Sequence, residues 1–403
     1  MRHKISYSAL FAAFCMVVTT ACGKGESGDP VNPPTPPKPG EDRSATTGID
    51  KEFDAATNIF SRNTFLVNDT AMQGFSLDSD GSVWYTQLSS TNPERLYFIK
   101  AQPNKGVSPV TANKEYMTLS YCGHGTNTAI EEKGSDRYLW AGTYGSCKKD
   151  DKDDKDDKVQ YWGGQLVGRV KYEAGKTVKP TDMECFYIGE GRTEAHPSID
   201  AENGLLTINY NDKAYSAFCC FVVYKLSDAL TAPLENVTIT CTDGFETGKP
   251  ASTNKISKVV RAHDLTQIKE VARPKFLKQG YGGTGIQYYD WQGYDVHGDR
   301  LYYAEGQSNY NLYGSYFSGG VSYAYITVFD TATNKVVEER TQVAVISDKE
   351  TTSAIGVSAT GTLEAEGVKV YGDKMYLGFT ARLRVEGNTQ HYQNIFVYNA
   401  AKR

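Results

Sequence analysis

The sequence predicts an all-β protein built as a five-bladed β-propeller. Residues 72–87 alternate apolar and polar side chains on both sides of a turn at 78–81, which is typical of a β-hairpin. Similar stretches recur at 126–140, 195–210, 292–303 and 366–379. Each is followed by one more apolar strand, at 96–99, 166–172, 221–226, 324–330 and 395–398. A hairpin plus a third strand makes most of a propeller blade, so five repeats predict five blades.

The gap between the third and fourth repeats leaves a second architecture open. Residues 236–240 and 255–260 lie in this gap and are rich enough in apolar and β-branched side chains to form strands. They could form a divergent sixth blade. We expect five blades, with the gap filled by long surface loops.

The two ends of the chain are expected to meet in one blade. Thr64 to Val67 is an apolar stretch without a hairpin partner of its own, just before the first repeat. The final strand at 394–398 would leave an open sheet edge if nothing paired with it. Residues 64–67 should therefore supply the outer strand of the fifth blade.

The N-terminal segment predicts export and a lipid anchor. Residues 1–21 carry basic residues and then a short apolar run, which is typical of a signal peptide. Cys22 at the end of this run indicates a lipoprotein signal, with an ordinary secretory signal as the alternative. Residues 22–50 are rich in proline and form a predicted disordered tether to the propeller at 51–403. We expect an exported protein, lipid-anchored to a bacterial membrane, at the outer membrane or cell surface.

Composition narrows the classes of partner. The formal net charge of -5 and the absence of a basic run argue against a nucleic-acid partner. The 28 tyrosines and 38 glycines suit an all-β chain with many turns. We expect a monomer that needs no cofactor.

The cysteines predict disulfides rather than a metal site. Six cysteines remain once Cys15 leaves with the signal peptide and Cys22 takes the lipid, and an even number in an exported chain favours disulfide bonds. Cys122 with Cys147 is the preferred pair, because these two residues bracket the second repeat. Zinc is the competing interpretation, but no pair shows finger-like spacing, so no metal is predicted.

Two further segments have alternative interpretations. The run of Lys and Asp at 148–158 is expected to be a solvated loop, although such a run might suggest calcium. Residues 281–295 are rich in glycine and aromatic side chains, which suits either stacking on sugar rings or the packing of blades.

The start of each predicted inner strand supplies the candidate site. In a propeller these strands line a central channel, and aligning the repeats places polar residues there. The predicted ligand-binding residues are Gln73, His124, Asn127, Glu194, His196, Trp291, Gln292 and Glu366. Such residues could instead merely solvate a structural channel. Glu194 and Glu366 are the candidates for paired catalytic carboxylates.

Three passages carry a family resemblance. They are residues 72–78 with 86–88, residues 123–131 with 138–140, and residues 292–299. The chain resembles, from about residue 70 to 398, the β-propeller domain shared by teichoic acid biosynthesis protein C, certain phage receptor-binding proteins and helveticin J-type bacteriocins. The resemblance implies a five-bladed propeller associated with cell-wall polymers or cell surfaces, without settled catalytic residues.

Together these observations predict an anchored propeller that binds a cell-surface or extracellular polysaccharide at its central channel face. One alternative is a glycoside hydrolase on the same fold. Another is a secreted antibacterial protein similar to helveticin J.

Overall fold

The computed structural model describes residues 53–92, 94–112, 115–149, 159–250, 252–277, 290–309, 321–343, 346, 349–357, 363–385 and 388–400. The predicted signal peptide, Cys22, the tether and most of the segments 148–158 and 281–295 lie outside these residues. No helix in the described part of the chain combines the length and the apolar character needed to cross a membrane.

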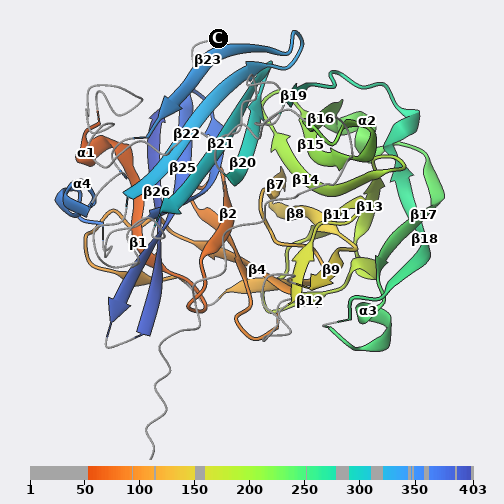
Figure 1. The fold of residues 1–403 in the computed structure, drawn as a ribbon, viewed down its shortest axis with the longest axis horizontal. Helices are drawn as coiled ribbons and strands as arrows, with labels where there is room; N and C mark the ends of the chain where they lie inside the picture. The colour runs from red at the N-terminus through yellow and green to blue at the C-terminus, as the bar shows by residue number, and fades with distance from the viewer. Residues whose placement is uncertain are drawn as a thin grey trace, which may run out of the picture.

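Five sheets form the blades of a β-propeller, as predicted (Figure 1). Blade 1 contains β2 (Met72–Leu77), β3 (Val83–Leu88), β4 (Arg95–Ala101), β6 (Tyr116–Ser120) and β12 (Thr177–Val178). Blade 2 contains β7 (Ala129–Lys133), β8 (Asp136–Thr143), β11 (Leu166–Lys171), β13 (Glu184–Tyr187), β18 (Lys255–Asp264) and β17 (Leu234–Thr242). Blade 3 contains β14 (Arg192–Asp200), β15 (Leu205–Asp212), β16 (Phe218–Lys225) and β19 (Lys275–Leu277).

The remaining elements complete the ring. Blade 4 contains β20 (Asp290–His297), β21 (Arg300–Asn309), β22 (Val321–Asp330) and β23 (Lys335–Gln342). Blade 5 contains β24 (Leu363–Tyr371), β25 (Lys374–Val385), β26 (Asn388–Asn399), β1 (Ile59–Phe65) and β5 (Val110–Thr111). β9 (Ser146–Lys149) and β10 (Val159–Trp162) form a separate pair. The short helices are α1 (Ala55–Asn58), α2 (Leu226–Leu230), α3 (Gly244–Thr247) and α4 (Lys349–Ala354).

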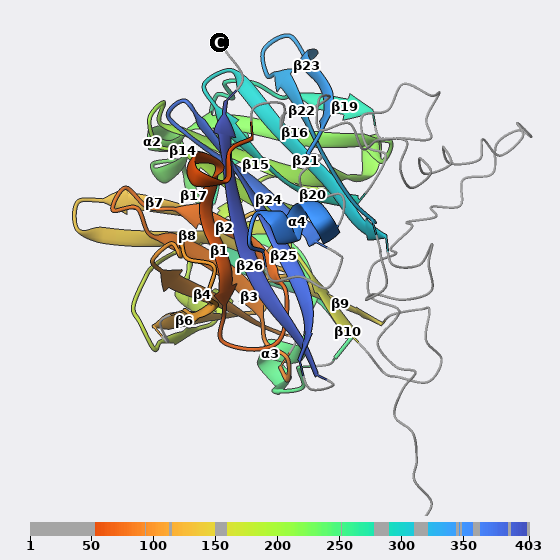
Figure 2. The same cartoon turned by 90° about the vertical axis from the view of Figure 1, so that its left-hand side faces the viewer.

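All five predicted hairpins and their third strands are confirmed. In blade 1, Phe75 lies opposite Tyr85, and in blade 4, Tyr294 lies opposite Tyr303. Each hairpin turn lies on one side of the ring, which we call the turn face. Figure 2 shows the β7–β8 hairpin projecting from this face, with β9 and β10 on the opposite side.

The long gap forms neither a sixth blade nor loops. β17 and β18 pair in antiparallel fashion from Leu234 to Thr242, and β18 then pairs in parallel with β13, with Phe186 opposite His263. Val237 and Ile239 are buried in the same cluster as the core of blade 2. A two-stranded ribbon is only marginally stable by itself, so β17 and β18 bury their apolar face by extending the sheet of blade 2.

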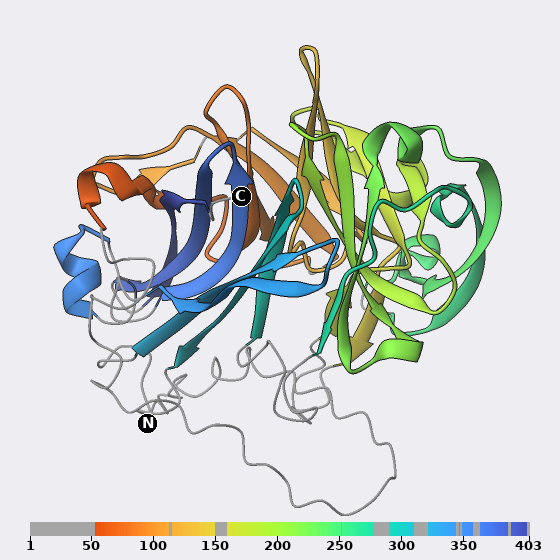
Figure 3. The same cartoon turned by 90° about the horizontal axis from the view of Figure 1, so that it is seen from above.

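The predicted closure of the ring is confirmed. β1 pairs with β26, with Thr64 opposite Gln393 and Phe65 opposite Tyr392. β1 begins earlier than predicted, at Ile59. A further hydrogen bond joins it to β26, because the Asn63 backbone N–H donates to Asn394 Oδ1 at 2.9 Å. Figure 3 shows the N-terminal strand, in orange, beside the C-terminal strands in dark blue.

Two similar polar groups lock the inner hairpins of blades 1 and 2. Trp84 Nε1 donates to Asp78, which also receives the Arg137 guanidinium of the next blade. Trp140 Nε1 donates to Glu131, which receives two nitrogens of Arg169. Charge-assisted bonds to buried carboxylates are among the stronger polar contacts, so they hold these indoles in fixed positions.

The predicted disulfide between Cys122 and Cys147 is wrong. All six described cysteines are buried thiols. Cys122 lies in the core between blades 1 and 2, against Thr143 and Met183, whereas Cys147 packs in another cluster with Tyr121 and Tyr161. Bracketing the same repeat in sequence does not bring the two sulfurs together, because Cys122 packs in the segment after β6 and Cys147 packs on β9, in different clusters.

Candidate functional site

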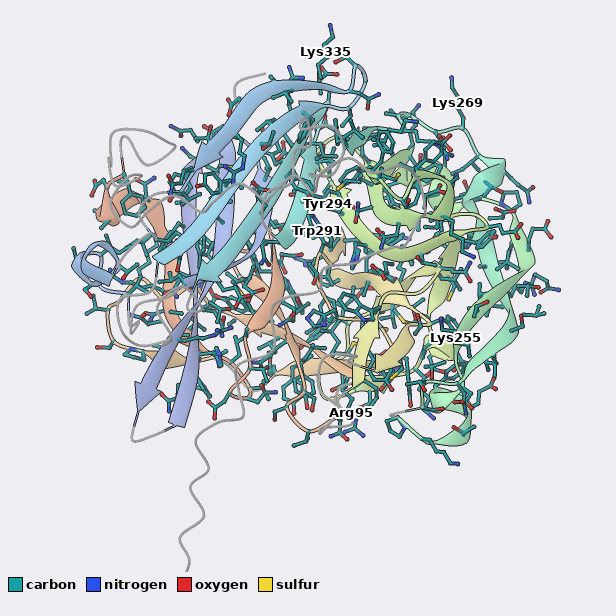
Figure 4. The ribbon with its side chains drawn as sticks, viewed as in Figure 1. Arg95, Lys255, Lys269, Trp291, Tyr294 and Lys335 are labelled. Carbon is teal, nitrogen blue, oxygen red and sulfur yellow. The ribbon has the colours of Figure 1, made fainter. Side chains whose placement is uncertain are left out.

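The inner strands of blades 1, 3, 4 and 5 carry β-bulges at matching positions. Register shifts occur between Met72 and Gly74, Thr193 and His196, Trp291 and Gly293, and Ala365 and Val368. We call the side of the ring where the inner strands begin the bulge face. A bulge re-aims side chains and often lies next to a functional site. Figure 4 shows Trp291 and Tyr294 near the middle of the ring, seen toward this face.

The axis is closed at the level of the bulges rather than open as a channel. A Cβ atom on Gly293 would lie 3.3 Å from Gly367 Cα and 3.2 Å from Asn127 Oδ1. A Cβ atom on Gly74 would lie 3.4 Å from Asn127 N. Gly293 and Gly367 also have φ values of 125° and 129°, which favour glycine. Small residues at this register therefore let the inner strands meet.

Asn127 ties three blades together at this closure. Its Nδ2 donates to Pro197 O at 3.0 Å in blade 3, and its Oδ1 accepts the Tyr294 backbone N–H at 2.9 Å in blade 4. The residue is buried, with a φ of 55° that asparagine tolerates better than most residues. Both polar groups of the Asn127 side chain thus form hydrogen bonds between blades, whereas the sequence predicted that Asn127 binds a ligand.

His196 and Trp291 bring blades 3 and 4 together on the bulge face. Their ring centroids are 4.9 Å apart at an angle of 59°. His196 Nδ1 lies 2.7 Å from the Thr126 carbonyl oxygen. Burial lowers the pKa of His196 to about 4, although the bond to the Thr126 carbonyl acts in the opposite direction. The imidazole is therefore neutral near pH 7.

His124 and Trp162 form a second aromatic pair on the same face. Their rings stack with centroids 5.8 Å apart and an angle of 17°. Burial and the nearby His196 lower the pKa of His124 to about 4, while Glu364 acts to raise it. His124 therefore lies within electrostatic reach of both blade 3 and blade 5.

Glu194 borders the second pair. It has a φ of 55°, and it accepts a hydrogen bond from Asn211 Nδ2 at 2.6 Å. A Cβ atom on Gly163, the residue after Trp162, would lie 3.1 Å from Glu194 Cα. Glu194 is half-buried, so it can still meet a ligand.

Blade 5 contributes two carboxyl groups and one guanidinium. Arg382 Nη2 donates to Glu364 Oε2 at 2.7 Å. Burial raises the pKa of Glu366 well above its usual value, and the neighbouring Glu364 adds to this effect. Arg382 and a hydrogen bond with Thr380 act in the opposite direction. Glu366 is thus a buried carboxyl group with a raised pKa, beside the Glu364–Arg382 ion pair.

The two predicted glutamines lie on the bulges themselves. Gln73 and Gln292 are both half-buried, and Gln292 Nε2 donates to Gly306 O at 3.3 Å. Their positions match the predicted register, and their role in binding stays a prediction. The pairing of Glu194 with Glu366 also stays a prediction, because the carboxyl group that acts on Glu366 is Glu364.

Sequence reasoning missed Arg382, Trp162 and His391. Arg382 lies on a second strand, outside the aligned inner strands. Trp162 follows the run of Lys and Asp, and the aromatic and glycine residues at 161–164 are the sequence signal that could have indicated it. His391 lies within electrostatic reach of Arg382 and Glu364, and its Nδ1 is 2.7 Å from the Asp69 carbonyl oxygen.

The turn face has a different character. A small cavity of about 60 Å³ lies there, and all five blades line it. Its charged residues are largely paired, with Lys369 Nζ 3.7 Å from Asp295 and His297 3.6 Å from Asp200. Within the described residues, no three metal-ligating side chains converge on one point. The bulge face therefore offers the larger set of half-buried aromatic and polar groups.

Fold and site define a five-bladed β-propeller with an aromatic and polar bulge face. No family model matches the chain, and no curated protein matches it. Among solved structures, it is similar to the tail fiber of Staphylococcus aureus phage P68, with 14% identity and a TM-score of 0.48, over 88% of this chain and 55% of the tail fiber. The chain thus spans about 55% of the length of that protein.

Two further solved structures show a weaker similarity. One is the Cellvibrio cellulosa α-L-arabinanase complexed with arabinohexaose, with 9% identity and a TM-score of 0.34, over 82% of this chain and 92% of the arabinanase. The other is a putative glycosidase from Bacteroides thetaiotaomicron, with 11% identity and a TM-score of 0.35, over 90% and 96% of the two chains. Such low similarity carries no argument about function, which must come from the residues of this chain.

Proposed function

We propose that this protein binds a cell-surface or extracellular polysaccharide on its bulge face. The observation that carries the proposal is the convergence of two aromatic and histidine pairs, His124 with Trp162 and His196 with Trp291. The first pair joins the segment before β7 to β10, and the second joins blades 3 and 4, so a chain molecule lying across the axis would meet both.

The chemistry of these groups suits sugars. Half-buried indole rings present flat apolar surfaces, and a few polar groups beside them fix the orientation of a ligand. Trp291 Nε1 is buried without a hydrogen-bond partner in the described structure, so a ligand oxygen would satisfy it. The resemblance to propellers of cell-wall polymer proteins points to the same class of ligand.

The proposed lipid anchor would leave the bulge face pointing outward. Inner strand β24 runs from the bulge face to the turn face, and each later strand of blade 5 reverses direction, so β1 starts on the turn side. A tether at residues 22–50, attached to Cys22, would therefore join the ring on the side opposite the binding groups.

Binding is tested on arrays of purified polysaccharides with the mature protein and with Trp291→Ala and Trp162→Ala. We expect binding to at least one polysaccharide, at least tenfold weaker in each variant, because each removes a stacking surface. Tyr371→Ala is the matched control, because this exposed aromatic residue lies at the turn face. Binding that survives both tryptophan substitutions would place the ligand elsewhere.

A glycoside hydrolase is the second candidate, favoured by one observation. Glycoside hydrolysis pairs a protonated carboxyl group with an ionised one, and burial raises the pKa of Glu366 beside the Glu364–Arg382 ion pair. Release of reducing ends that Glu366→Gln abolishes would support hydrolysis. Binding without any released sugar would support the first proposal.

A further inference from the structure

We propose that the turn-face cavity is a second binding site, which takes a small hydroxyl-bearing group such as a free polyol or the end of a sugar chain. It lies on the side of the ring opposite the bulge face, so it is separate from the polysaccharide site proposed above. The cavity measures about 60 Å³, and all five blades line it. One water needs only about 10 to 15 Å³, so a group of a few heavy atoms fits.

Lys369 brings into this cavity an amino group that makes no hydrogen bond with the described residues. Its side chain is only 10% exposed, and its charged neighbour is Asp295, whose Oδ1 lies 3.7 Å from Lys369 Nζ, beyond hydrogen-bond range. Burial lowers the pKa of Lys369, whereas Asp295 acts in the opposite direction. The amino group carries N–H donors in either protonation state. A buried donor without an acceptor is costly, so Lys369 needs an acceptor oxygen from elsewhere.

The carboxyl group of Asp295 is held in place by the two neighbouring blades. Ser198 Oγ of blade 3 donates to Asp295 Oδ1, and the Val370 backbone N–H of blade 5 donates to Asp295 Oδ2 at 2.7 Å. These bonds keep the carboxyl group from turning toward Lys369. A carboxylate oxygen has two lone pairs, so Asp295 Oδ1 can accept one more hydrogen bond.

A hydroxyl group suits the gap between these two residues. Its oxygen can lie about 2.8 Å from both Lys369 Nζ and Asp295 Oδ1, where it accepts from the first and donates to the second. An ionised carboxylate has no hydrogen to donate, so it would satisfy Lys369 alone and would meet the lone pairs of Asp295. The gap therefore favours a hydroxyl group over an anion.

The apolar part of the lining favours a ligand with carbon atoms over trapped water. Four blades each contribute an aliphatic residue, namely Leu77, Ile130, Ile199 and Val370. A buried water needs two to four polar partners, which aliphatic side chains do not offer. The carbon atoms of a polyol would contact these side chains while one of its hydroxyl groups bridges Lys369 and Asp295.

The test measures binding to the mature protein by saturation-transfer NMR with three probes. Erythritol represents a free polyol, maltohexaose represents the end of a neutral sugar chain, and acetate represents a small anion. We expect millimolar binding of erythritol, because a ligand with so few heavy atoms gains little free energy. Acetate should bind at least roughly tenfold more weakly.

Two variants remove the site in different ways. Ala201 is exposed and lines the cavity, so Ala201→Trp should block the entrance without disturbing the core. The double variant Lys369→Met with Asp295→Asn removes both charges, which avoids leaving one buried charge without its partner. Each variant should weaken erythritol binding at least roughly tenfold. Lys374→Met is the matched control, because the Lys374 side chain is 43% exposed and its Nζ donates to Asn399 Oδ1 at 2.8 Å.

Each outcome decides the inference. Loss of erythritol binding in both variants, with the control unchanged, would support it, and maltohexaose binding that only Ala201→Trp and the double variant remove would identify a chain end as the ligand. Acetate that binds the cavity more tightly than erythritol would overturn the preference for a hydroxyl group. Binding lost in Trp291→Ala instead would place the ligand on the bulge face, which would overturn this inference and keep the proposed function. No binding of erythritol or maltohexaose at the cavity would mean that it holds water alone, which also overturns the inference.

Discussion

Asn127 in blade 2 accepts the backbone N–H of Tyr294 in blade 4 through a 2.9 Å hydrogen bond across the axis of the ring. The other end of the same amide donates to Pro197 O in blade 3. One side chain thus links three inner strands directly beneath the bulge face. The position predicted as part of a ligand site is a structural junction.

Asn127→Ala should destabilise the ring. It leaves a buried Tyr294 N–H and a buried Pro197 carbonyl without partners, which should cost about 2 to 4 kcal/mol of unfolding free energy. Urea denaturation followed by fluorescence measures this loss. Asn236→Ala, at an exposed position on β17, is the control and should change stability little. Equal midpoints for the two variants would show that the axial bonds contribute nothing.

Truncation tests the closure of the ring. A chain starting at Phe53 should melt like the mature protein, because β1 is retained. A chain starting at Asn68 should fail to fold, because it loses the β1–β26 ladder and buried side chains worth about 1.5 to 3 kcal/mol each. Circular dichroism melts distinguish the two. Matching melts would mean that the ring closes without β1.

Stability should fall as the pH drops from about 6.5 to about 4. Folded His196 resists protonation until about pH 4, whereas an unfolded histidine takes its proton near 6.5, so the unfolded chain binds more protons in this window. The contribution of His196 is roughly 3 kcal/mol, lost as the pH falls. His196→Asn should flatten, without abolishing, the plot of melting temperature against pH, because His124 and His391 shift in the same direction. An unchanged slope would contradict the burial of a neutral ring.

The two carboxyl groups of β24 should respond oppositely to amide substitution. Burial raises the pKa of Glu366, so its protonated form favours the fold at low pH and this benefit is lost as the pH rises through the raised pKa. Glu366→Gln should therefore preserve or increase the melting temperature at pH 8. Glu364→Gln should lower it, because Arg382 loses its ion pair. The prediction fails if both variants lose stability equally.

The cysteines should behave as buried thiols. Burial raises the pKa of Cys122 to about 12, which suppresses the reactive thiolate. In the folded mature protein we expect negligible reaction with a thiol reagent such as DTNB. Six thiols per chain should react after denaturation. Fewer reactive thiols in denaturant, restored by a reductant, would reveal disulfides.

Local patterns predicted most of the fold and only part of the site. Alternation and turn residues in 72–87 and its repeats are local signals, so the five hairpins and their third strands follow from them. The lone apolar stretch at 64–67 predicted ring closure, because an unpaired strand needs an edge. The bulges at Gly74, His196, Gly293 and Gly367 were not predicted and appear only in the pairing of the strands.

Tertiary structure decided the rest, because the deciding contacts join residues far apart in the chain. The strands at 234–242 and 255–264 extend blade 2, because β18 pairs with its strand β13. The sulfurs of Cys122 and Cys147 stay apart because the chain places them in different packed clusters. The role of Asn127 depends on the distance to Tyr294, and the raised pKa of Glu366 depends on burial beside Glu364. The sequence alone determined the five hairpin repeats, and only the packing of five blades determined which groups meet at the centre of the ring and what each of them does there.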